Sequence, residues 1–151
     1  MDFLNKYRKI VDGLVKKSFP ELKRKKIIIE EKNTLKYRAH TEYSFSGFKI
    51  FISTQLRDFS EQKVKRILIH ELCHLEIFLH QGFIWTNIEW FIYLISKRYR
   101  LNIEREANIL MIKKGYGKLV LEARRENLKR RLGYSLTEKE IKSYAKSIKK
   151  W

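Results

Sequence analysis

The pentapeptide His-Glu-Leu-Cys-His matches the pattern H-E-x-x-H and constrains its part of the chain more than any other feature. The pattern has chemical meaning only on an α-helix. At about 100° per residue, His70 and His74 lie about 40° apart on such a helix, one turn above each other. Two imidazoles at that spacing can bind one tetrahedral zinc ion at about 2.0–2.1 Å. We therefore expect a long helix that opens with a capping box at Asp58 and Glu61 and runs to about Leu79.

Glu71 is the residue of this motif that we expect to act as a catalytic base. It lies about 100° around the helix from His70, beside the metal ligands but not among them. Its carboxylate can take a proton from a water that the metal activates, so that hydroxide attacks a carbonyl carbon. Glu71 then passes the proton to the leaving amine. Cys73 points away from the ligand face, so we expect a small buried residue there rather than a nucleophile.

A catalytic zinc needs a third protein ligand and one open position, and two residues compete for that role. Glu104 and Asn108 are four residues apart in a predicted helix, so Glu104 can bind the metal while Asn108 orients a histidine from outside. Glu106 points to another face and is expected to be a solvated charge. The alternative ligand is His80. It reaches the metal only if the helix breaks near Ile77, where neither glycine nor proline provides a break.

The rest of the chain predicts an α+β fold in which helices dominate. Apolar residues at helical spacing begin the chain, and three runs rich in β-branched and aromatic residues precede the H-E-x-x-H helix. The strands are expected to form a small three-stranded antiparallel sheet, with a turn at Ser46 and Gly47. One of them, at residues 48–53, is a candidate edge for binding a peptide by strand addition. The expected strands are 26–31, 35–43 and 48–53, and the other expected helices are 3–17, 83–96, 101–114, 118–132 and one after Thr137.

The length of 151 residues fits a single domain over residues 1–151, with a basic helical C-terminal part from about residue 118. One cysteine excludes an internal disulfide, and the N-terminus has no pattern of a signal peptide, so a cytoplasmic location is expected. The most apolar stretch, residues 83–95, has thirteen residues, whereas a membrane span needs about twenty. We expect no membrane span; this stretch is read as a core helix or, alternatively, as a segment lying on a membrane surface.

The net charge of the chain is +17, and residues 97–151 carry 17 Lys and Arg against 6 Asp and Glu, a net charge of +11. Such a charge attracts nucleic acid, anionic lipid or acidic substrates. No Gly-rich or aromatic-interleaved basic motif accompanies it. A solvated surface is therefore the favoured interpretation, and nucleic-acid binding stays possible but not favoured. The oligomeric state does not follow from the sequence.

The HELCH motif, followed about thirty residues later by EREAN at residues 104–108, resembles the gluzincin clan of metallopeptidases. The similarity covers roughly residues 60–117. It is greatest to minimal archaeal gluzincins and to the catalytic cores of the heat-shock and CAAX-processing membrane peptidases, and the ImmA/IrrE group is similar too. The resemblance implies a zincin-like domain with one Zn²⁺ held by His70, His74 and Glu104. It also implies Glu71 as the base and a protein or peptide as the substrate. The clan usually has aspartate where this chain has Asn108.

The clan also uses a tyrosine or histidine to steady the transition state. Tyr116, Tyr99 and His40 are candidates here, and none is favoured. A second resemblance is to SprT-like zinc proteins, in which HELCH is common and a later histidine and aromatic pair follow, as His80 and Trp85 do here. Those proteins act on DNA-bound proteins, which suits the charge. We thus expect a zinc metallopeptidase, with a SprT-like DNA-associated zinc protein or a basic nucleic-acid-binding regulatory protein as the alternative.

Overall fold

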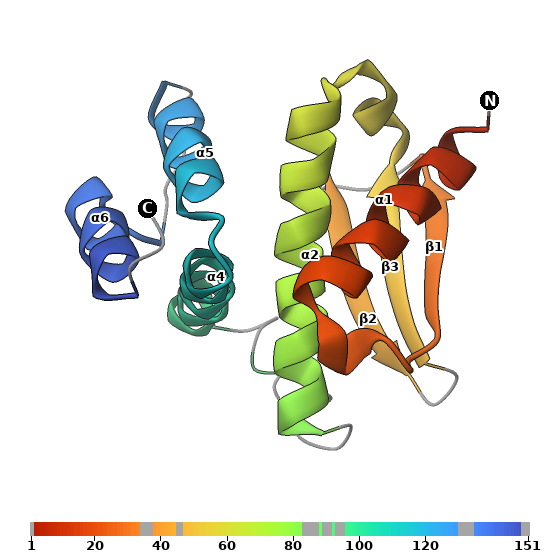
Figure 1. The fold of residues 1–151 in the computed structure, drawn as a ribbon, viewed down its shortest axis with the longest axis horizontal. Helices are drawn as coiled ribbons and strands as arrows, with labels where there is room; N and C mark the ends of the chain where they lie inside the picture. The colour runs from red at the N-terminus through yellow and green to blue at the C-terminus, as the bar shows by residue number, and fades with distance from the viewer. Residues whose placement is uncertain are drawn as a thin grey trace. The chain divides into compact units, whose positions relative to one another are not determined.

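Five α-helices and a three-stranded sheet make up the part of the chain that the computed structural model describes, which is residues 2–33, 38–44, 47–82, 88, 92, 96–129 and 135–148. The expected α+β class, with helix predominant, is confirmed (Figure 1). Contacts divide the chain into two compact units, residues 1–87 and 88–151. The sheet and the H-E-x-x-H helix belong to the first unit, and three helices belong to the second.

The first unit follows the predicted order of a helix, three strands and a long helix. The predicted helix 3–17 and the strands 26–31 and 48–53 agree with the structure to within one residue at each end. The predicted strand 35–43 begins later in the structure, at Ala39, and residues 35–37 lie outside the described part of the chain. The elements are α1 (Phe3–Ser18), the short 3-10 helix η1 (Pro20–Leu22), β1 (Ile27–Lys32), β2 (Ala39–Ser44), β3 (Gly47–Ser53), the 3-10 helix η2 (Thr54–Asp58) and α2 (Glu61–Gln81).

The sheet is mixed, so the prediction of an antiparallel sheet is wrong for one of its two pairings. Its strand order is β1-β3-β2, in which β3 runs antiparallel to β2 but parallel to β1. The strand β3 is the most apolar of the three. Ile50 and Ile52 are fully buried on one of its faces, and Phe51 is 3% exposed on the other. A strand that is buried on both faces is best placed at the centre of a sheet. The candidate peptide-binding edge at residues 48–53 is therefore also wrong, because β1 and β2 are the edges.

One face of the sheet forms the core of the first unit. Ile29, Ile50 and Ile52 lie on that face and are at most 3% exposed, because alternate residues of a strand point to the same side. The helices α1 and α2 cover it (Figure 1). Burying one such isoleucine side chain stabilises the fold by about 1.5–3 kcal/mol. This apolar packing holds α2 against β2 and so fixes the orientation of the helix that carries the motif.

The helix α2 starts and ends at residues other than those expected. Its N-cap is Ser60, whose Oγ accepts the N–H of Lys63 at 3.4 Å. Asp58 instead ends η2, so the predicted capping box at Asp58 is wrong, because Ser60 stands directly before the first helical turn. At the other end, Gly82 adopts a positive φ of 81° and stops the helix after Gln81. The helix is therefore continuous through Ile77.

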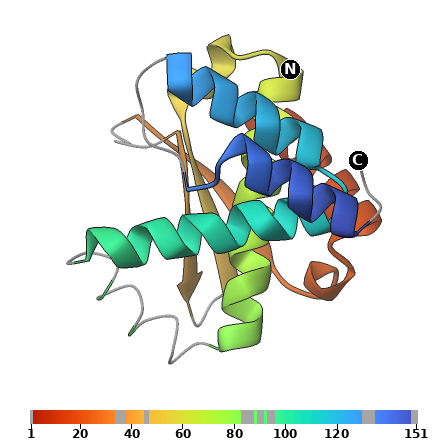
Figure 2. The same ribbon diagram turned by 90° about the vertical axis from the view of Figure 1, so that its left-hand side faces the viewer.

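The described part of the second unit includes three helices that pack on one another, α4 (Lys97–Lys113), α5 (Gly117–Lys129) and α6 (Glu138–Ser147) (Figure 2). The predicted helices 101–114 and 118–132 correspond to α4 and α5. The helix expected after Thr137 is α6, and Thr137 and Glu140 form a reciprocal capping box at its start. Most of the predicted helix 83–96 and the end of the 118–132 helix lie outside the described residues. None of the helices that the structure describes is long and apolar enough to cross a membrane.

Candidate metal centre

His70 and His74 project side by side from one face of α2, as their spacing predicts. Their Nε2 atoms are 3.1 Å apart, and their rings are nearly perpendicular, at 86°. A zinc ion about 2.05 Å from both nitrogens would make an N–Zn–N angle of about 98°, so a few tenths of an ångström of opening gives the tetrahedral angle. The same separation suits a hydrogen bond between the two rings. The distance between the two Nε2 atoms is therefore compatible with a shared metal ion as well as with a hydrogen bond between the rings.

The two histidines are shielded from solvent to different degrees. His74 is only 6% exposed, whereas His70 is half-buried. The ring of His74 stacks on Phe78, with centroids 6.1 Å apart. Leu72 and Leu75 are fully buried on the same helix, but they lie about 180° and 120° around it from the centre of the pair. An environment that excludes water strengthens electrostatic interactions with any charge held there.

Glu71 is also removed from solvent, at 7% exposure. A carboxylate in such a place costs free energy unless its charge is balanced by partners, and residues of this kind in water-poor surroundings are frequent at functional sites. Its neighbour Cys73 is a fully buried free cysteine, as expected for a small packing residue. The motif thus contributes one carboxylate and two imidazoles to the same stretch of α2.

Sequence reasoning missed a further polar group on this helix. Arg66 lies one turn before His70 and is 6% exposed. At about 100° per residue it falls within about 40° of His70 on the helix surface, so Arg66, His70 and His74 form one stripe. Buried arginines are held by groups that balance their charge. The signal in the sequence was the spacing of four residues between members of the stripe.

Glu104 lies on α4 of the second unit, where the sequence predicts a helix, and its side chain is half-buried. Asn108 is 4% exposed. Its Nδ2 donates to the backbone oxygen of Glu104 at 2.8 Å and to Oγ of Ser135 at 3.0 Å. Both hydrogen bonds of this amide nitrogen are therefore made within the second unit. Glu106 is exposed, as expected, and Glu104 as a zinc ligand stays a prediction.

The competing ligand His80 is engaged elsewhere in the first unit. Its Nε2 lies 2.9 Å from Oε2 of Glu21, which belongs to η1. Because α2 continues unbroken to Gln81, His80 lies about 120° around the helix from His74. The helix break that would turn His80 toward the His70–His74 pair is absent. Together with Glu76, His80 and Glu21 instead form a separate cluster of potential metal ligands.

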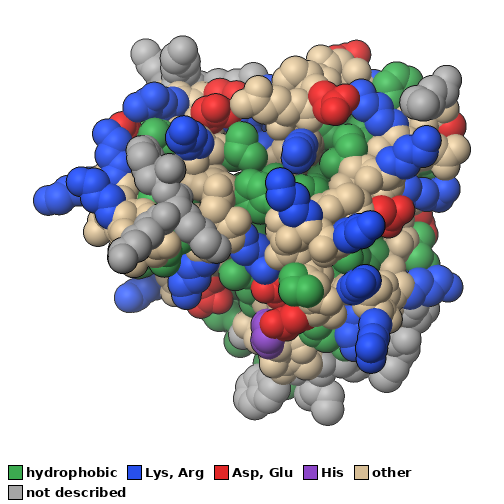
Figure 3. All heavy atoms as spheres, in the orientation of Figure 1, with side chains coloured by type: hydrophobic (Ala, Val, Ile, Leu, Met, Phe, Trp, Pro, Cys, Tyr) green, Lys and Arg blue, Asp and Glu red, His purple; other side chains and the backbone are tan. Residues whose placement is uncertain are grey.

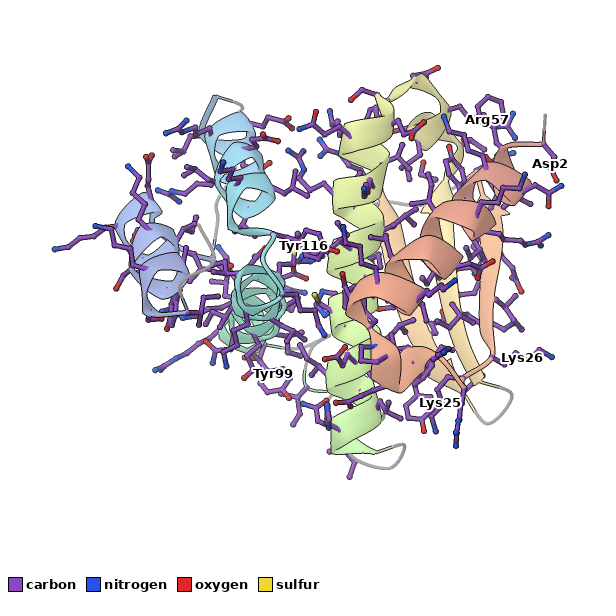
Figure 4. The ribbon with its side chains drawn as sticks, in the orientation of Figure 1. Asp2, Lys25, Lys26, Arg57, Tyr99 and Tyr116 are labelled. Carbon is purple, nitrogen blue, oxygen red and sulfur yellow. The ribbon has the colours of Figure 1, made fainter. Side chains whose placement is uncertain are left out.

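The three candidates for transition-state stabilisation lie on different elements. His40 is on β2, opposite Phe51 in the strand register and so on the sheet face away from the Ile50 side. Burial lowers the pKa of His40; the charge of Glu42 opposes this, and the smaller effect of Lys32 adds to it. Tyr99 is in the first turn of α4, and Tyr116 lies between α4 and α5 (Figure 4). The second unit thus holds both tyrosine candidates.

No protein-family model, curated protein or solved structure matches this chain. The functional argument therefore depends on the residues themselves. Besides the histidine pair, the surface charge is the main feature. Lys and Arg side chains are spread over the face seen in Figure 3, with acidic side chains among them.

Proposed function

We propose that this protein is a zinc-dependent metallopeptidase that hydrolyses peptide bonds. His70, His74 and Glu104 would hold one Zn²⁺, and Glu71 would act as the base. The observation that carries the proposal is the convergence of the two Nε2 atoms, 3.1 Å apart, beside a carboxylate that is 7% exposed. Few other functions need two imidazoles and a glutamate in this order on one helix turn.

The roles of the chain's own groups follow from their placement on α2. Zinc bound there would supply the Lewis acidity that lowers the pKa of a water molecule toward about 7. Glu71 would accept the proton of the attacking water and deliver it to the amine that leaves. The burial of His74 and Glu71, which are 6% and 7% exposed, would limit the access of other water to the reacting atoms. A general base at this position contributes typically about 10²- to 10⁴-fold to the rate.

Glu104 is the better third ligand because it comes from a separate helix. A carboxylate with two neutral imidazoles leaves a zinc site with a net charge of +1, which costs less to bury than +2. Glu104 is half-buried on α4, whereas the imidazole of His80 lies within ion-pair distance of the Glu21 carboxylate. With the Nδ2 of Asn108 donating within the second unit, any orientation of a histidine by Asn108 would use its Oδ1 as acceptor.

The substrate is proposed to be a protein or a peptide. An extended peptide can add to a free sheet edge through main-chain hydrogen bonds. The edge strand β2, on which α2 packs, is the favoured place, since β3 is paired on both sides. The single cysteine, which is buried as a free thiol, supports the further proposal of a cytoplasmic location.

Zinc content measured by elemental analysis tests the metal site. We expect His70→Ala to lose one equivalent of zinc relative to the wild type. His40→Ala is the matched control, since it removes a histidine outside the motif, and should keep the wild-type content. A wild-type protein without stoichiometric zinc at neutral pH would refute the proposal.

The net charge of +17 favours a second candidate, a DNA-associated or other nucleic-acid-binding protein. Such binding should weaken steeply with salt, because each neutralised phosphate releases counterions. Anisotropy of a labelled DNA duplex across a salt series tests it. Tight, salt-sensitive binding that is unchanged in Glu71→Gln would support this candidate, and no binding at low salt would dismiss it.

A further inference from the structure

A second cluster of metal-ligating side chains lies on another face of α2. Glu76 and His80 are four residues apart on the helix and therefore project from one face, and Glu21 reaches them from η1. The ligand atoms of the three residues all lie within 4.8 Å of one another. All three belong to the first unit. At about 100° per residue, their face is about 120° from the centre of the His70–His74 face, so the two groups cannot share one ion.

We propose that Glu21, Glu76 and His80 form a second divalent-metal site, distinct from the proposed catalytic one. The His80 Nε2 and Glu21 Oε2 atoms are 2.9 Å apart. An ion about 2.1 Å from both would make an angle of about 87°, which suits adjacent positions of an octahedron better than a tetrahedron. One imidazole and two carboxylates are ligands for zinc and for the borderline transition metals near it.

The charge balance of the cluster also favours a divalent cation. Two carboxylates this close together repel each other, and one of them, Glu76, is only 6% exposed. A protonated His80 supplies one positive charge against two negative charges, whereas a divalent ion with a neutral imidazole balances both. The cluster lies in the last turns of α2, which ends at Gln81. The partial negative charge of a helix C-terminus further stabilises a cation there.

The partial exposure of the cluster makes it an open metal site that is accessible to solvent. The side chains of Glu21 and His80 are 51% and 62% exposed, respectively, so water can complete the coordination of the ion. An open site with three protein ligands binds zinc from solution and exchanges it. Bound metal would tie η1 to the last turns of α2 and so stabilise the first unit against unfolding by linkage.

Zinc stoichiometry after dialysis against buffered Zn²⁺ tests the second site. We expect two equivalents for the wild type, one for His80→Ala and one for His70→Ala. Glu21→Gln should lower the affinity for the same zinc ion that His80→Ala removes. His40→Ala is the control and should keep two. Because the side chain of His80 is mostly exposed, its truncation should leave the fold intact, which circular dichroism checks.

The outcomes separate this site from the proposed catalytic one. If the wild type binds one zinc that is lost in His80→Ala and kept in His70→Ala, the second site stands and the catalytic proposal falls. If His80→Ala keeps all the zinc of the wild type, the second site is refuted. The second site is also refuted if the wild type binds a single zinc and either substitution alone removes it, because His80 then belongs to the first site. Loss of zinc in His40→Ala would also refute it, since surface histidines in general would then be responsible.

Discussion

Glu140 on α6 forms an ion pair with Arg105 on α4, the helix that carries Glu104. Replacing Glu140 should therefore destabilise the second unit. Oε1 of Glu140 lies 2.7 Å from Nη2 of Arg105, and Oε2 accepts the backbone N–H of Thr137 at 2.7 Å. Arg105 also donates to the backbone oxygen of Ser135 at 3.1 Å. The hydrogen bond from Arg105, followed by those from Thr137, lowers the pKa of the Glu140 carboxyl from 4.5 to about 2.

This lowered pKa sets the size and the sign of the effect. A shift of about 2.5 units corresponds to at most about 3.4 kcal/mol. The Glu140 side chain is 36% exposed, and solvent screening reduces the value, so we expect about 1 kcal/mol at pH 7. Because the pKa is lower in the folded state, this contribution is complete above pH 4.5 and is lost as the pH falls toward about 2.

Urea denaturation of Glu140→Gln and the wild type at pH 7 and pH 3.5, with hydrogen exchange of the α6 amides, measures the effect. We expect the variant to lose about 1 kcal/mol at pH 7 and clearly less at pH 3.5. A double-mutant cycle with Arg105→Gln isolates the pair, and Lys139→Gln, at an exposed neighbouring position, is the control. Equal stability of the variant at pH 7, or a deficit that grows on acidification, would refute the reasoning.

Three further predictions concern the metal ligand and the core of the first unit. In a His80→Ala background, Glu104→Ala should weaken zinc binding by more than about 100-fold, since even residues that only orient ligands are worth about 10- to 100-fold. The exposed Glu106→Ala should leave the affinity unchanged, and calorimetric titration compares the two. Ile50→Ala, at the centre of the sheet, should cost about 2–5 kcal/mol in urea denaturation, and Phe3→Ala, at a position 42% exposed, much less. The Tyr7 hydroxyl is buried with no hydrogen-bond partner among the described residues, so Tyr7→Phe should match or exceed the wild type in stability, by up to about 1 kcal/mol.

The helices were predictable because their signals are local. Tyr7, Val11 and Leu14 recur at helical spacing, and all three are buried on α1. The order of the strands depends on which strand needs burial on both faces, and this is decided by contacts between residues far apart in the chain. Ile29 on β1 and Ile50 on β3 are register partners, although β2 lies between them in sequence. Consecutive strands usually pair, which is why the antiparallel prediction failed.

The candidate site, like the fold, was predictable only where its geometry depends on a single helix. The convergence of His70 and His74 needs only the geometry of one helix, and the structure reproduces it. The partner of His80 is Glu21, 59 positions earlier in the chain, and no local pattern indicates that pairing. The burial of Arg66 likewise follows from packing rather than from the motif. The third ligand depends on tertiary arrangement in the same way, and Glu104 in that role rests on spacing and on resemblance.

The central claim is that Glu71 is the base of a zinc peptidase, and cleavage of a peptide library followed by mass spectrometry tests it most directly. Glu71→Gln and its parent are compared in the His80→Ala background, so that zinc content reports only on the His70–His74 site. The account predicts one zinc per chain in both proteins, with cleavage by the parent and a rate at least about 100-fold lower in Glu71→Gln. Equal cleavage by both proteins, or a parent that holds no zinc, would contradict it.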